Sequence, residues 1–440
     1  MKDILLILLY SALFVLIIYI VPFFGISNIK RKYIAALFIA KVLASIVIVL
    51  IYTYYYTDKS QSDIYKYYYD GNVLYSALKD NPNDYFRMLT GINANTEDLK
   101  PYYTEMGSWF KAFNYGLYND NRTIIRFNAV FRIFSFGSIY VHNIFMSFLA
   151  FLGLTALSKV FIKYIQNKQV FILIAVFLMP SVLLWSSANL KEGIVLFAFG
   201  FLFYGIDNII NKQKIILSII FIALSSILLI YSKFYVFIAA IPGIVFLIWL
   251  KINCKEKFIL LKFLAVHILF FGLIMCNHLF LKLKPDVFET IAYKQNDFIN
   301  FAIASNAGSY IEIPKLSPDI ISFIKATPTA LLNSLFRPFI TDVHSVIMIP
   351  AFIETYLIII FLILGIIYFD KTSFIKNKTL FYFSISFVSI ILLLTGLTTP
   401  VLGALVRYKV PALPFIGLII IILTDDKRLK KLIKKPKYYE

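Results

Sequence analysis

The sequence predicts an all-α, polytopic integral membrane protein, and three observations support this prediction. Of its 440 residues, 60% are hydrophobic and the mean hydropathy is +0.80, which is more apolar surface than a soluble fold can bury. Apolar runs of about 20 residues, the length that crosses a bilayer, recur along the chain. Basic residues are also distributed unevenly between the connections. The same composition excludes a disordered chain and a coiled coil.

Eleven apolar runs are predicted to span the membrane. They lie near residues 4–24, 33–56, 139–158, 169–186, 190–206, 215–232, 235–250, 258–281, 346–369, 379–398 and 408–424. The fourth and fifth form a closely broken pair. The first run is too long for a signal peptide, only one lysine (Lys2) precedes it, and no small-residue cleavage site follows it, so it is predicted to be an anchor.

The charge of the connections predicts the orientation. The short connections 25–32, 159–168, 207–214, 251–257 and 370–378 and the tail 425–440 carry +15 of the total +19 and fall on one face. The long loops 57–138 and 284–345 are almost neutral. Positively charged connections stay in the cytoplasm. We therefore expect an outer N-terminus, a cytoplasmic C-terminus and two long extracytoplasmic loops with interfacial helices.

The predicted organisation is one transmembrane domain over 1–424 and a basic cytoplasmic tail over 425–440. The tail is predicted to contact anionic lipid rather than nucleic acid. The two cysteines, Cys254 and Cys276, have neither metal-ligand spacing nor enough partners for a disulfide framework. The sequence also contains no nucleotide-binding loop. We expect no metal and no cofactor.

The first outer loop opens with S-D-I-Y-K-Y-Y-Y-D-G, from Ser62 to Gly71. In a helix, Asp63, Lys66, Tyr67 and Asp70 share one face. A carboxylate there could act as general base on a sugar hydroxyl, and the tyrosines could stack on sugar rings. The tyrosines could equally form an interfacial aromatic belt.

An amphipathic helix is predicted to begin at Asn121 and to end near Gly137. It carries Arg122, Arg126 and Arg132. Such a helix lies in the membrane interface, where its arginines can bind either the phosphates of bulk lipid or a phosphorylated substrate.

The break between the fourth and fifth runs ends in Asn189-Leu-Lys191-Glu192-Gly193. Asn189 and Glu192 have the spacing of a capping box, which is the structural interpretation of Glu192; the alternative is a catalytic carboxylate. Lys191 places a cation at an outward helix start, where the backbone N–H groups also attract anions. We therefore interpret Lys191 as a phosphate-binding residue.

The second outer loop ends with Arg337, Asp342 and His344 within eight residues. This group suits anion binding with acid–base chemistry, and an Arg337–Asp342 salt bridge beside an interfacial histidine explains it equally well. Lys233, Arg407 and Lys409 are further cations at outer ends of spans. Other charges lie inside predicted spans: Glu354 is expected to pair with one of these outer cations, and Lys41 and Lys262 to extend their ammonium groups to the interface.

Arginine is used selectively. The chain has 35 lysines and eight arginines, and six of the arginines lie on segments predicted to face outward. Arginine binds phosphate bidentately, whereas lysine acts as a point charge. The pattern indicates an extracytoplasmic phosphate or pyrophosphate.

Five motifs carry a family resemblance that extends from about residue 63 to 415. They are S-D-I-Y-K-Y-Y-Y-D-G, R-F-N-A-V-F-R-I-F-S-F-G, P-S-V-L-L-W-S-S-A-N-L-K-E-G, F-R-P-F and R-Y-K-V-P-A-L-P-F. Together they resemble bacterial O-antigen and exopolysaccharide polymerases and, more distantly, GT-C lipid-linked glycosyltransferases. The chain departs from these families in having no D-x-D or W-W-D signature, and it has Lys233-Phe234 where an Arg-Pro pair is expected.

The resemblance implies an enzyme of the bacterial inner membrane that uses polyprenyl-phosphate- or pyrophosphate-linked sugars on its outer side. On that analogy Arg337, Arg407, Lys191 and Arg126 would hold the pyrophosphate, and Asp63, Asp70 or His344 would be the base. Two other interpretations stay open: a flippase or transporter of lipid-linked sugars, and a structural partner of a secretion complex. Other polysaccharide-assembly proteins are candidate partners of the enzyme.

Overall fold

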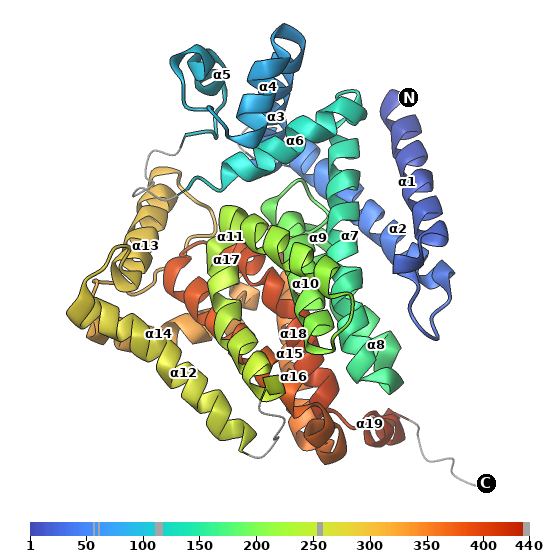
Figure 1. Ribbon diagram of the computed structural model, residues 1–440, viewed down its shortest axis with the longest axis vertical. Coiled ribbons are helices and arrows are strands. Elements are labelled where there is room, and N and C mark those ends of the chain that lie inside the picture. The colour runs from blue at the N-terminus through green and yellow to red at the C-terminus, as the bar shows by residue number, and fades with distance from the viewer. Residues whose placement is uncertain (56–57, 60–61, 111–117, 253–257, 434–440) are drawn as a thin grey trace. The chain divides into compact units, whose positions relative to one another are not determined.

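The computed structural model describes residues 1–440 apart from 56–57, 60–61, 111–117, 253–257 and 434–440. Within the described residues the chain forms helices and no β-strand (Figure 1). This confirms the predicted all-α class. The α-helices are α1 Lys2–Ile20, α2 Arg31–Leu50, α3 Asp63–Asp80, α4 Pro82–Thr90, α5 Lys100–Glu105, α6 Asn121–Ser135, α7 Ile139–Tyr164, α8 Gln169–Phe177, α9 Pro180–Trp185, α10 Lys191–Ile210, α11 Ile215–Ile252, α12 Ile259–Cys276, α13 Val287–Ala304, α14 Ile320–Phe336, α15 Ile349–Ile367, α16 Lys371–Thr398, α17 Leu402–Tyr408, α18 Leu413–Leu423 and α19 Asp426–Ile433.

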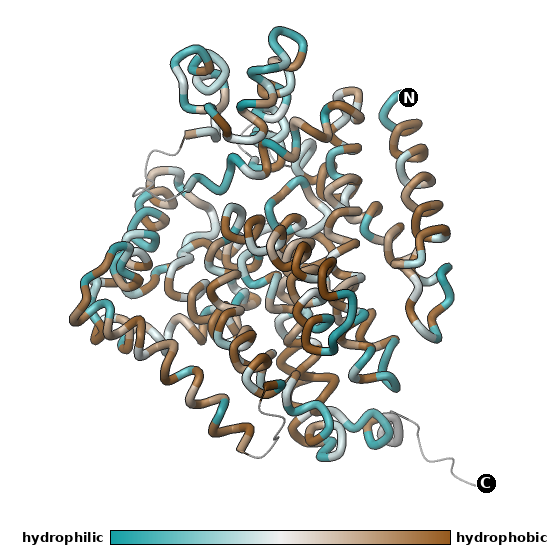
Figure 2. Tube along the Cα trace, in the orientation of Figure 1, coloured by the Kyte–Doolittle hydropathy of each residue, from teal (hydrophilic) through white to brown (hydrophobic). Residues whose placement is uncertain are grey.

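Nine helical segments among the described residues are long and apolar enough to cross a membrane, so the chain is a polytopic helical protein. They are Lys2–Ile20, Arg31–Tyr55, Ile139–Tyr164, Lys191–Ile210, Ile215–Ile252, Ile259–Leu281, Val346–Ile367, Lys371–Thr398 and Leu402–Leu423. Figure 2 shows α1 and α12 as hydrophobic over most of their length, whereas α4, α5 and α19 are largely hydrophilic.

The difference from eleven predicted runs has two physical sources. The run predicted near 169–186 is divided into α8, of nine residues, and α9, of six, and each is too short to span the roughly 30 Å apolar core alone. The runs predicted at 215–232 and 235–250 form the 38-residue α11, which has non-helical backbone angles at Lys233. At 1.5 Å per residue α11 is about 57 Å long, so its two crossings stay a prediction, as does the orientation.

Contacts divide the chain into two compact units. Unit 1 comprises Met1–Lys159 and Val182–Phe234, and unit 2 comprises Val160–Ser181 and Tyr235–Glu440. Three helices, α7, α9 and α11, begin in one unit and end in the other. The interpretation of 1–424 as a single transmembrane domain stays a prediction.

In unit 1, small residues allow two pairs of helices to approach closely. A Cβ atom on Gly200 of α10 would lie 2.0 Å from the carbonyl oxygen of Gly153 in α7, so only glycine fits this crossing. Likewise, a Cβ on Gly71 of α3 would lie 2.4 Å from the Cβ of Asn128 in α6. The second contact fixes α3 against α6 and so positions the polar residues that both helices carry.

In unit 2, a glycine likewise allows α14 and α16 to pack closely. A Cβ on Gly396 of α16 would lie 2.0 Å from the carbonyl oxygen of Ala330 in α14.

The buried side chain of Lys168 donates to the carbonyl oxygens of Ile421, at 2.9 Å, and Thr424, at 2.5 Å, near the end of α18. A cation at a helix C-terminus complements its dipole, so Lys168 has a structural role.

The predicted long loops contain several helices in their described parts. Loop 57–138 contains α3 to α6, and loop 284–345 contains α13 and α14. The amphipathic helix predicted to begin at Asn121 is confirmed as α6, and the predicted helix from Asp63 is confirmed as α3. Of the candidate site residues, α3 carries Asp63, Lys66, Tyr67 and Asp70, and α6 carries Arg126 and Arg132.

Candidate functional site

The candidate residues fall into two sets, one in each unit. Unit 1 contains Asp63, Lys66, Tyr67, Asp70, Arg126, Arg132, Lys191, Glu192 and Lys233. Unit 2 contains Arg337, Asp342, His344 and Arg407. Each set is described within its own unit.

In unit 1, α3, α6 and α10 bring together a cluster of four side chains: Tyr67, Asp120, Asn121 and Lys191, hereafter the Lys191 cluster. The ammonium of Lys191 lies 2.7 Å from a carboxylate oxygen of Asp120 and donates to Asn121 Oδ1 at 2.7 Å. The hydroxyl of Tyr67 donates to the same oxygen at 3.1 Å, and Lys191 lies over the Tyr67 ring. Lys191 is 6% exposed. Its charge is therefore balanced within the protein by Asp120.

The chain just before α10 is held by a buried amide network. Asn189 and Asn128 exchange hydrogen bonds of 2.8 and 2.9 Å between their side chains, and the backbone N–H of Asn189 donates to Asn143 Oδ1 at 2.7 Å. His142 completes the network through Asn128 Oδ1, at 2.7 Å, and Ser135, at 2.8 Å. A fully bonded polar network rigidifies the segment it holds, so it fixes the start of α10.

The capping-box interpretation of Asn189 and Glu192 is wrong. The residue that precedes α10 is Leu190, which provides no side-chain cap, and the amide of Asn189 is bonded to Asn128 and to the carbonyl oxygen of Ile64. The structure buries Glu192 in the first turn of α10, with 3% exposure. The prediction that Lys191 stands at a helix start is confirmed.

Lys41 does not extend to the interface, contrary to expectation. It is fully buried in α2, and its ammonium donates to Ser186 Oγ at 2.6 Å. Ser186 lies in the segment between α9 and α10, which the buried amide network also holds. A buried charge in an apolar helix is costly, and such residues in membrane proteins face the protein interior.

Asp70 anchors the chain that follows α5. One carboxylate oxygen accepts the N–H of Gly107 at 2.9 Å and the other accepts the N–H of Ser108 at 2.8 Å. Burial raises the pKa of the Asp70 carboxyl, and the hydrogen bonds from Ser108 and Gly107 oppose this shift. Both oxygens are therefore occupied by backbone donors, which is a structural arrangement.

The arginines of α6 contact aromatic rings and backbone carbonyls. Arg126 donates to the Met88 carbonyl oxygen at 2.9 Å and to the Tyr118 hydroxyl at 2.8 Å, and lies 5.5 Å from the Trp109 ring centroid. Arg132 lies over the Tyr75 ring, at 5.0 Å. Cation–π contacts of this kind tie α6 to the surrounding loop.

Three further candidates in unit 1 are placed individually. Asp63 is the first residue of α3, and Lys66, one turn further on, is half-buried. Lys233 is the residue at which α11 departs from helical angles, with φ −152° and ψ 78°.

In unit 2, the end of α14 forms the Arg337 cluster, which consists of Asn333, Arg337, Asp342 and Lys409. Arg337 Nη1 pairs with an Asp342 carboxylate oxygen at 2.9 Å, and its Nε donates to Asn333 Oδ1 at 3.2 Å. The second Asp342 oxygen accepts the N–H of Phe339 at 2.8 Å. The guanidinium also lies over the Phe339 ring, at 5.1 Å. The predicted Arg337–Asp342 pair is confirmed as a direct contact.

One nitrogen of Arg337 is not used by these contacts. Nη2 makes no hydrogen bond within the described residues, and the side chain is 25% exposed. Asp342 and Asn333 hold the guanidinium plane in place, so Nη2 is a pre-oriented donor at the surface of unit 2.

Lys409 supports the cluster from the protein interior. It is 4% exposed, and its ammonium donates to the carbonyl oxygen of Arg337 at 3.1 Å and to the hydroxyl of Thr355 at 3.4 Å. It also contacts the carbonyl oxygen of Ser334 at 3.5 Å. These carbonyls end α14, so the lysine neutralises the negative end of that helix.

Glu354 has a related role at a helix start. Its carboxylate accepts the N–H of Ser181, near the start of α9, at 2.7 Å. The expected ion pair with an outer cation is not formed within 4 Å among the described residues, although Lys409 is a charged neighbour. The two buried charges therefore each complement a helix end.

His344 and Arg407 lie close to this cluster in the chain. His344 follows Asp342 by two residues and is exposed. Arg407 precedes Lys409 by two residues and is half-buried at the end of α17. Arg337 and Asp342 therefore belong to the cluster itself, and His344 and Arg407 each lie two residues from one of its members.

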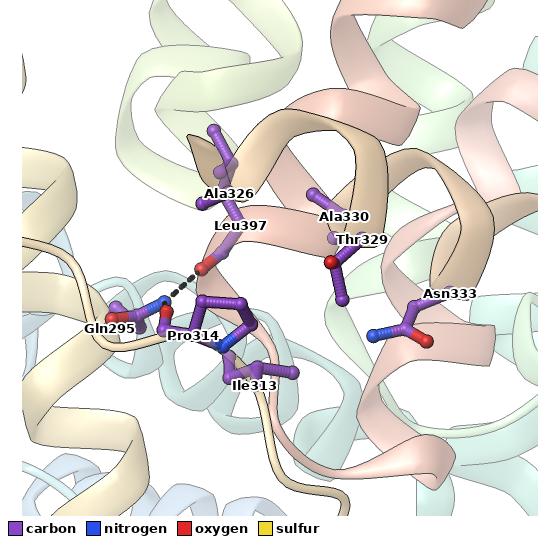
Figure 3. Close-up of a pocket in the computed structure, with 9 residues that line it drawn as sticks. Gln295, Ile313, Pro314, Ala326, Thr329, Ala330, Asn333 and Leu397 are labelled. Carbon is purple, nitrogen blue, oxygen red and sulfur yellow. Dashed lines mark hydrogen bonds between the residues drawn. The ribbon is translucent and has the colours of Figure 1, made fainter. Parts of the chain in front are cut away.

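A narrow crevice without room for a water molecule lies beside Asn333 (Figure 3). Gln295 closes one side by donating to the carbonyl oxygens of Leu397, at 2.7 Å, and Pro314, at 3.0 Å, and Asn333 lies on the other side. Asn333 also accepts a hydrogen bond from Arg337, so the crevice lies next to one of the side chains that orient the Arg337 guanidinium. Its lining comprises Gln295, Ile313, Pro314, Ala326, Thr329, Ala330, Asn333, Gly396 and Leu397.

The described residues include no group of three or more His, Cys, Asp or Glu side chains placed to hold a metal ion. The supporting residues Asp120, Asn121, Asn128 and Asn333 were not predicted as site residues. Asp120 and Asn121 carry no local signal, because their partner Lys191 lies about 70 residues away in the sequence. Asn333 has the i, i+4 spacing to Arg337 of a helical contact, which could have identified it.

Comparisons of the chain with known protein-family models, with curated proteins and with solved structures give no match.

Proposed function

We propose that this chain is a glycosyltransferase of a bacterial inner membrane that joins polyprenyl-pyrophosphate-linked oligosaccharides on the extracytoplasmic face. The observation that carries the proposal is the geometry of Arg337. Its guanidinium is oriented by Asn333 and Asp342, yet Nη2 is left without a protein partner among the described residues. A pre-oriented donor of this kind suits a phosphate oxygen.

In the proposed reaction, the acceptor sugar hydroxyl loses its proton to a base and attacks the anomeric carbon of the donor. The bond from that carbon to the pyrophosphate oxygen breaks, and the polyprenyl pyrophosphate leaves with the bonding electrons. Arg337 stabilises the charge that develops on the leaving group. Arg407 supplies further positive charge from α17.

We assign the base to His344. Asp342, the carboxylate of the Arg337 cluster, already accepts hydrogen bonds from Arg337 and Phe339, one at each oxygen. His344 follows two residues later and is exposed. Imidazole also exchanges protons near neutral pH. Asp70 is less suited, because two backbone N–H groups occupy its oxygens.

The test is the length of the polysaccharide made by cells that carry Arg337→Ala as their only copy. We expect long chains to disappear and single repeats to accumulate, because loss of one charge-stabilising donor slows such reactions about 10²- to 10³-fold. Arg428→Ala is the matched control, because Arg428 is also paired with an aspartate, Asp425, in the predicted cytoplasmic tail. Normal chain length in Arg337→Ala at a normal protein level contradicts the proposal.

Asp342→Asn separates phosphate binding from a structural salt bridge. If Arg337 serves only to pair with Asp342, both variants lose the same stability and activity. If Arg337 binds phosphate, Asp342→Asn keeps the cation and most of the chain length, whereas Arg337→Ala does not.

A second candidate function, a flippase or transporter of lipid-linked sugars, is favoured by one observation. Lys41, Glu354 and Lys409 are buried in helical segments long enough to cross a membrane. Buried charges within spans often line a transport path. Lys409 and Glu354 complement helix ends and Lys41 does not, so Lys41 is the residue chosen to test this alternative. Movement of a lipid-linked sugar across liposomes that is lost in Lys41→Met would support it.

A further inference from the structure

Unit 1 contains an open depression of about 540 Å³ beside α4. Its lining comprises Asn83, Phe86, Arg87, Thr90, Ile92, Asn93 and Thr96. None of these residues belongs to the Lys191 cluster. The volume lies in the range of small-molecule sites.

The local sequence explains how the depression forms. Asn83, Phe86 and Thr90 are spaced i, i+3 and i+7, so they share one face of α4. The helix ends at Gly91, whose φ of +84° is accessible to glycine and turns the chain. The residues from Ile92 to Thr96 then return beside the same face.

Arg87 fixes the returning chain. Its guanidinium pairs with Asp84 at 3.0 Å and Asp98 at 2.6 Å, and its Nε donates to the carbonyl oxygen of Asn93 at 3.0 Å. It also donates to Thr96 Oγ1. A wall held by this many bonds is organised before any ligand arrives, which lowers the cost of binding.

The charge of Arg87 is neutralised within the protein. The hydrogen bond from Arg87 lowers the pKa of Asp98 to about 2, so this carboxylate is ionised at neutral pH. Asp84 supplies a second carboxylate. A phosphate would meet no uncompensated cation in this depression, so its polar groups favour an uncharged ligand.

Two kinds of side chain are left for such a ligand. The side-chain amides of Asn83 and Asn93 make no hydrogen bond within the described residues, and both residues are exposed. Phe86 is 55% exposed and Ile92 is 68% exposed. Amides bind hydroxyl groups as donor and acceptor together, and an aromatic face packs against the C–H face of a sugar ring.

We propose that this depression binds an uncharged saccharide. The binding is separate from the transfer reaction and uses none of the residues assigned to it. The inference therefore goes beyond the proposed function and gives loop 57–138 a role in holding a glycan chain.

The test is saturation-transfer NMR on the full chain in nanodiscs. The probe is the oligosaccharide that mild acid releases from the polyprenyl lipids of cells producing the protein. We expect saturable transfer to sugar ring protons, weakened about three- to tenfold by Phe86→Ala and by Asn83→Ala. Phe301→Ala, which removes a similarly exposed phenylalanine (61%) from α13, is the matched control and should bind as the wild type does.

Three results overturn the inference. The first is no transfer to the sugar in the wild type. The second is transfer that persists in Phe86→Ala and is lost in Arg337→Ala, which would place the sugar at the Arg337 cluster and leave the proposed function intact. The third is displacement of the sugar by inorganic pyrophosphate in Arg337→Ala, which would make the depression an anion site.

A membrane contact of the same face is the remaining alternative. In the variant Phe86→Trp the new indole reports its surroundings once Trp109, Trp185 and Trp249 have been replaced by phenylalanine. Quenching of its fluorescence by brominated lipid would show that the face enters the bilayer and would contradict the inference. Absence of quenching supports a face open to a soluble glycan.

Discussion

The contacts of each ionisable side chain distinguish structural charges from candidate functional ones. Lys191 and Asp70 were both predicted as site residues, but Lys191 is paired with Asp120 and Asp70 binds two backbone N–H groups. Arg337 is also paired, yet it keeps a donor that no described residue accepts. A charge that is only partly satisfied is better suited to bind a ligand than one that is fully bonded.

Asp70→Asn tests the structural role of Asp70. The new amide presents one acceptor to two N–H donors and turns its NH₂ group toward one of them. We expect a loss of about 1–3 kcal/mol in the free energy of unfolding, seen as a lower thermal midpoint in nanodiscs. An unchanged midpoint together with lost polysaccharide would instead identify Asp70 as the base.

The difference in stability between the wild type and Asp70→Asn should depend on pH, and the pKa of Asp70 gives the direction of this dependence. Because burial raises the pKa of Asp70, the unfolded chain releases this proton before the folded chain does as pH rises. The stability linked to this proton is present below the ordinary carboxyl range and is lost as pH rises through the raised pKa. The thermal midpoint of the wild type should therefore exceed that of Asp70→Asn by less as pH rises through this range. A difference in midpoint that grows with pH would contradict the raised pKa of Asp70.

Close approach between helices depends on a few glycines. Gly153 and Gly200 allow α7 and α10 to meet backbone to backbone, and α10 begins with Lys191. In contrast, Gly272 of α12 has open space around it. The same residue type therefore has opposite consequences in two apolar helices.

Gly200→Ala is expected to destabilise the protein by several kcal/mol, because a Cβ at 2.0 Å from the Gly153 oxygen forces the backbones apart. Gly272→Ala is the control and should be neutral or stabilising by about 0.5–1 kcal/mol, since alanine is the better helix former. Thermal midpoints of the two purified variants give the comparison. Equal midpoints would show that the α7–α10 contact is not a close one.

The path of α11 decides the number of crossings. Two predicted spans share this helix, and its backbone departs from helical angles at Lys233. If the chain turns there, Gln213 and Lys251 lie on the cytoplasmic side and Lys233 on the outer side. Single cysteines at these positions, in a background with Cys254 and Cys276 changed to serine, should react with a membrane-impermeant maleimide only at 233. Labelling of position 213 or 251 from outside would give α11 one crossing.

Hydropathy and charge predicted the fold class and most helices, because burial in lipid acts on about 20 neighbouring residues at once. Helix breaks were predicted unevenly. The runs 215–232 and 235–250 placed a boundary at Lys233, where the backbone angles depart from helical values, whereas the α8–α9 break at Leu178 and Met179 was not predicted. Partners distant in sequence, such as Asn128 and Asn189, carry no local signal. Arg337 and Asp342 were predictable as a pair because only five residues separate them.

Turnover by the purified protein tests the central proposal most directly. The full chain is placed in liposomes with polyprenyl-pyrophosphate-linked oligosaccharide donor and acceptor on one side, and glycan length is measured over time. We predict products longer than one repeat from the wild type and from Arg428→Ala, with formation about 10²- to 10³-fold slower in Arg337→Ala. Movement of the lipid-linked sugar across the bilayer without any longer product, or equal rates in the wild type and Arg337→Ala, would contradict it.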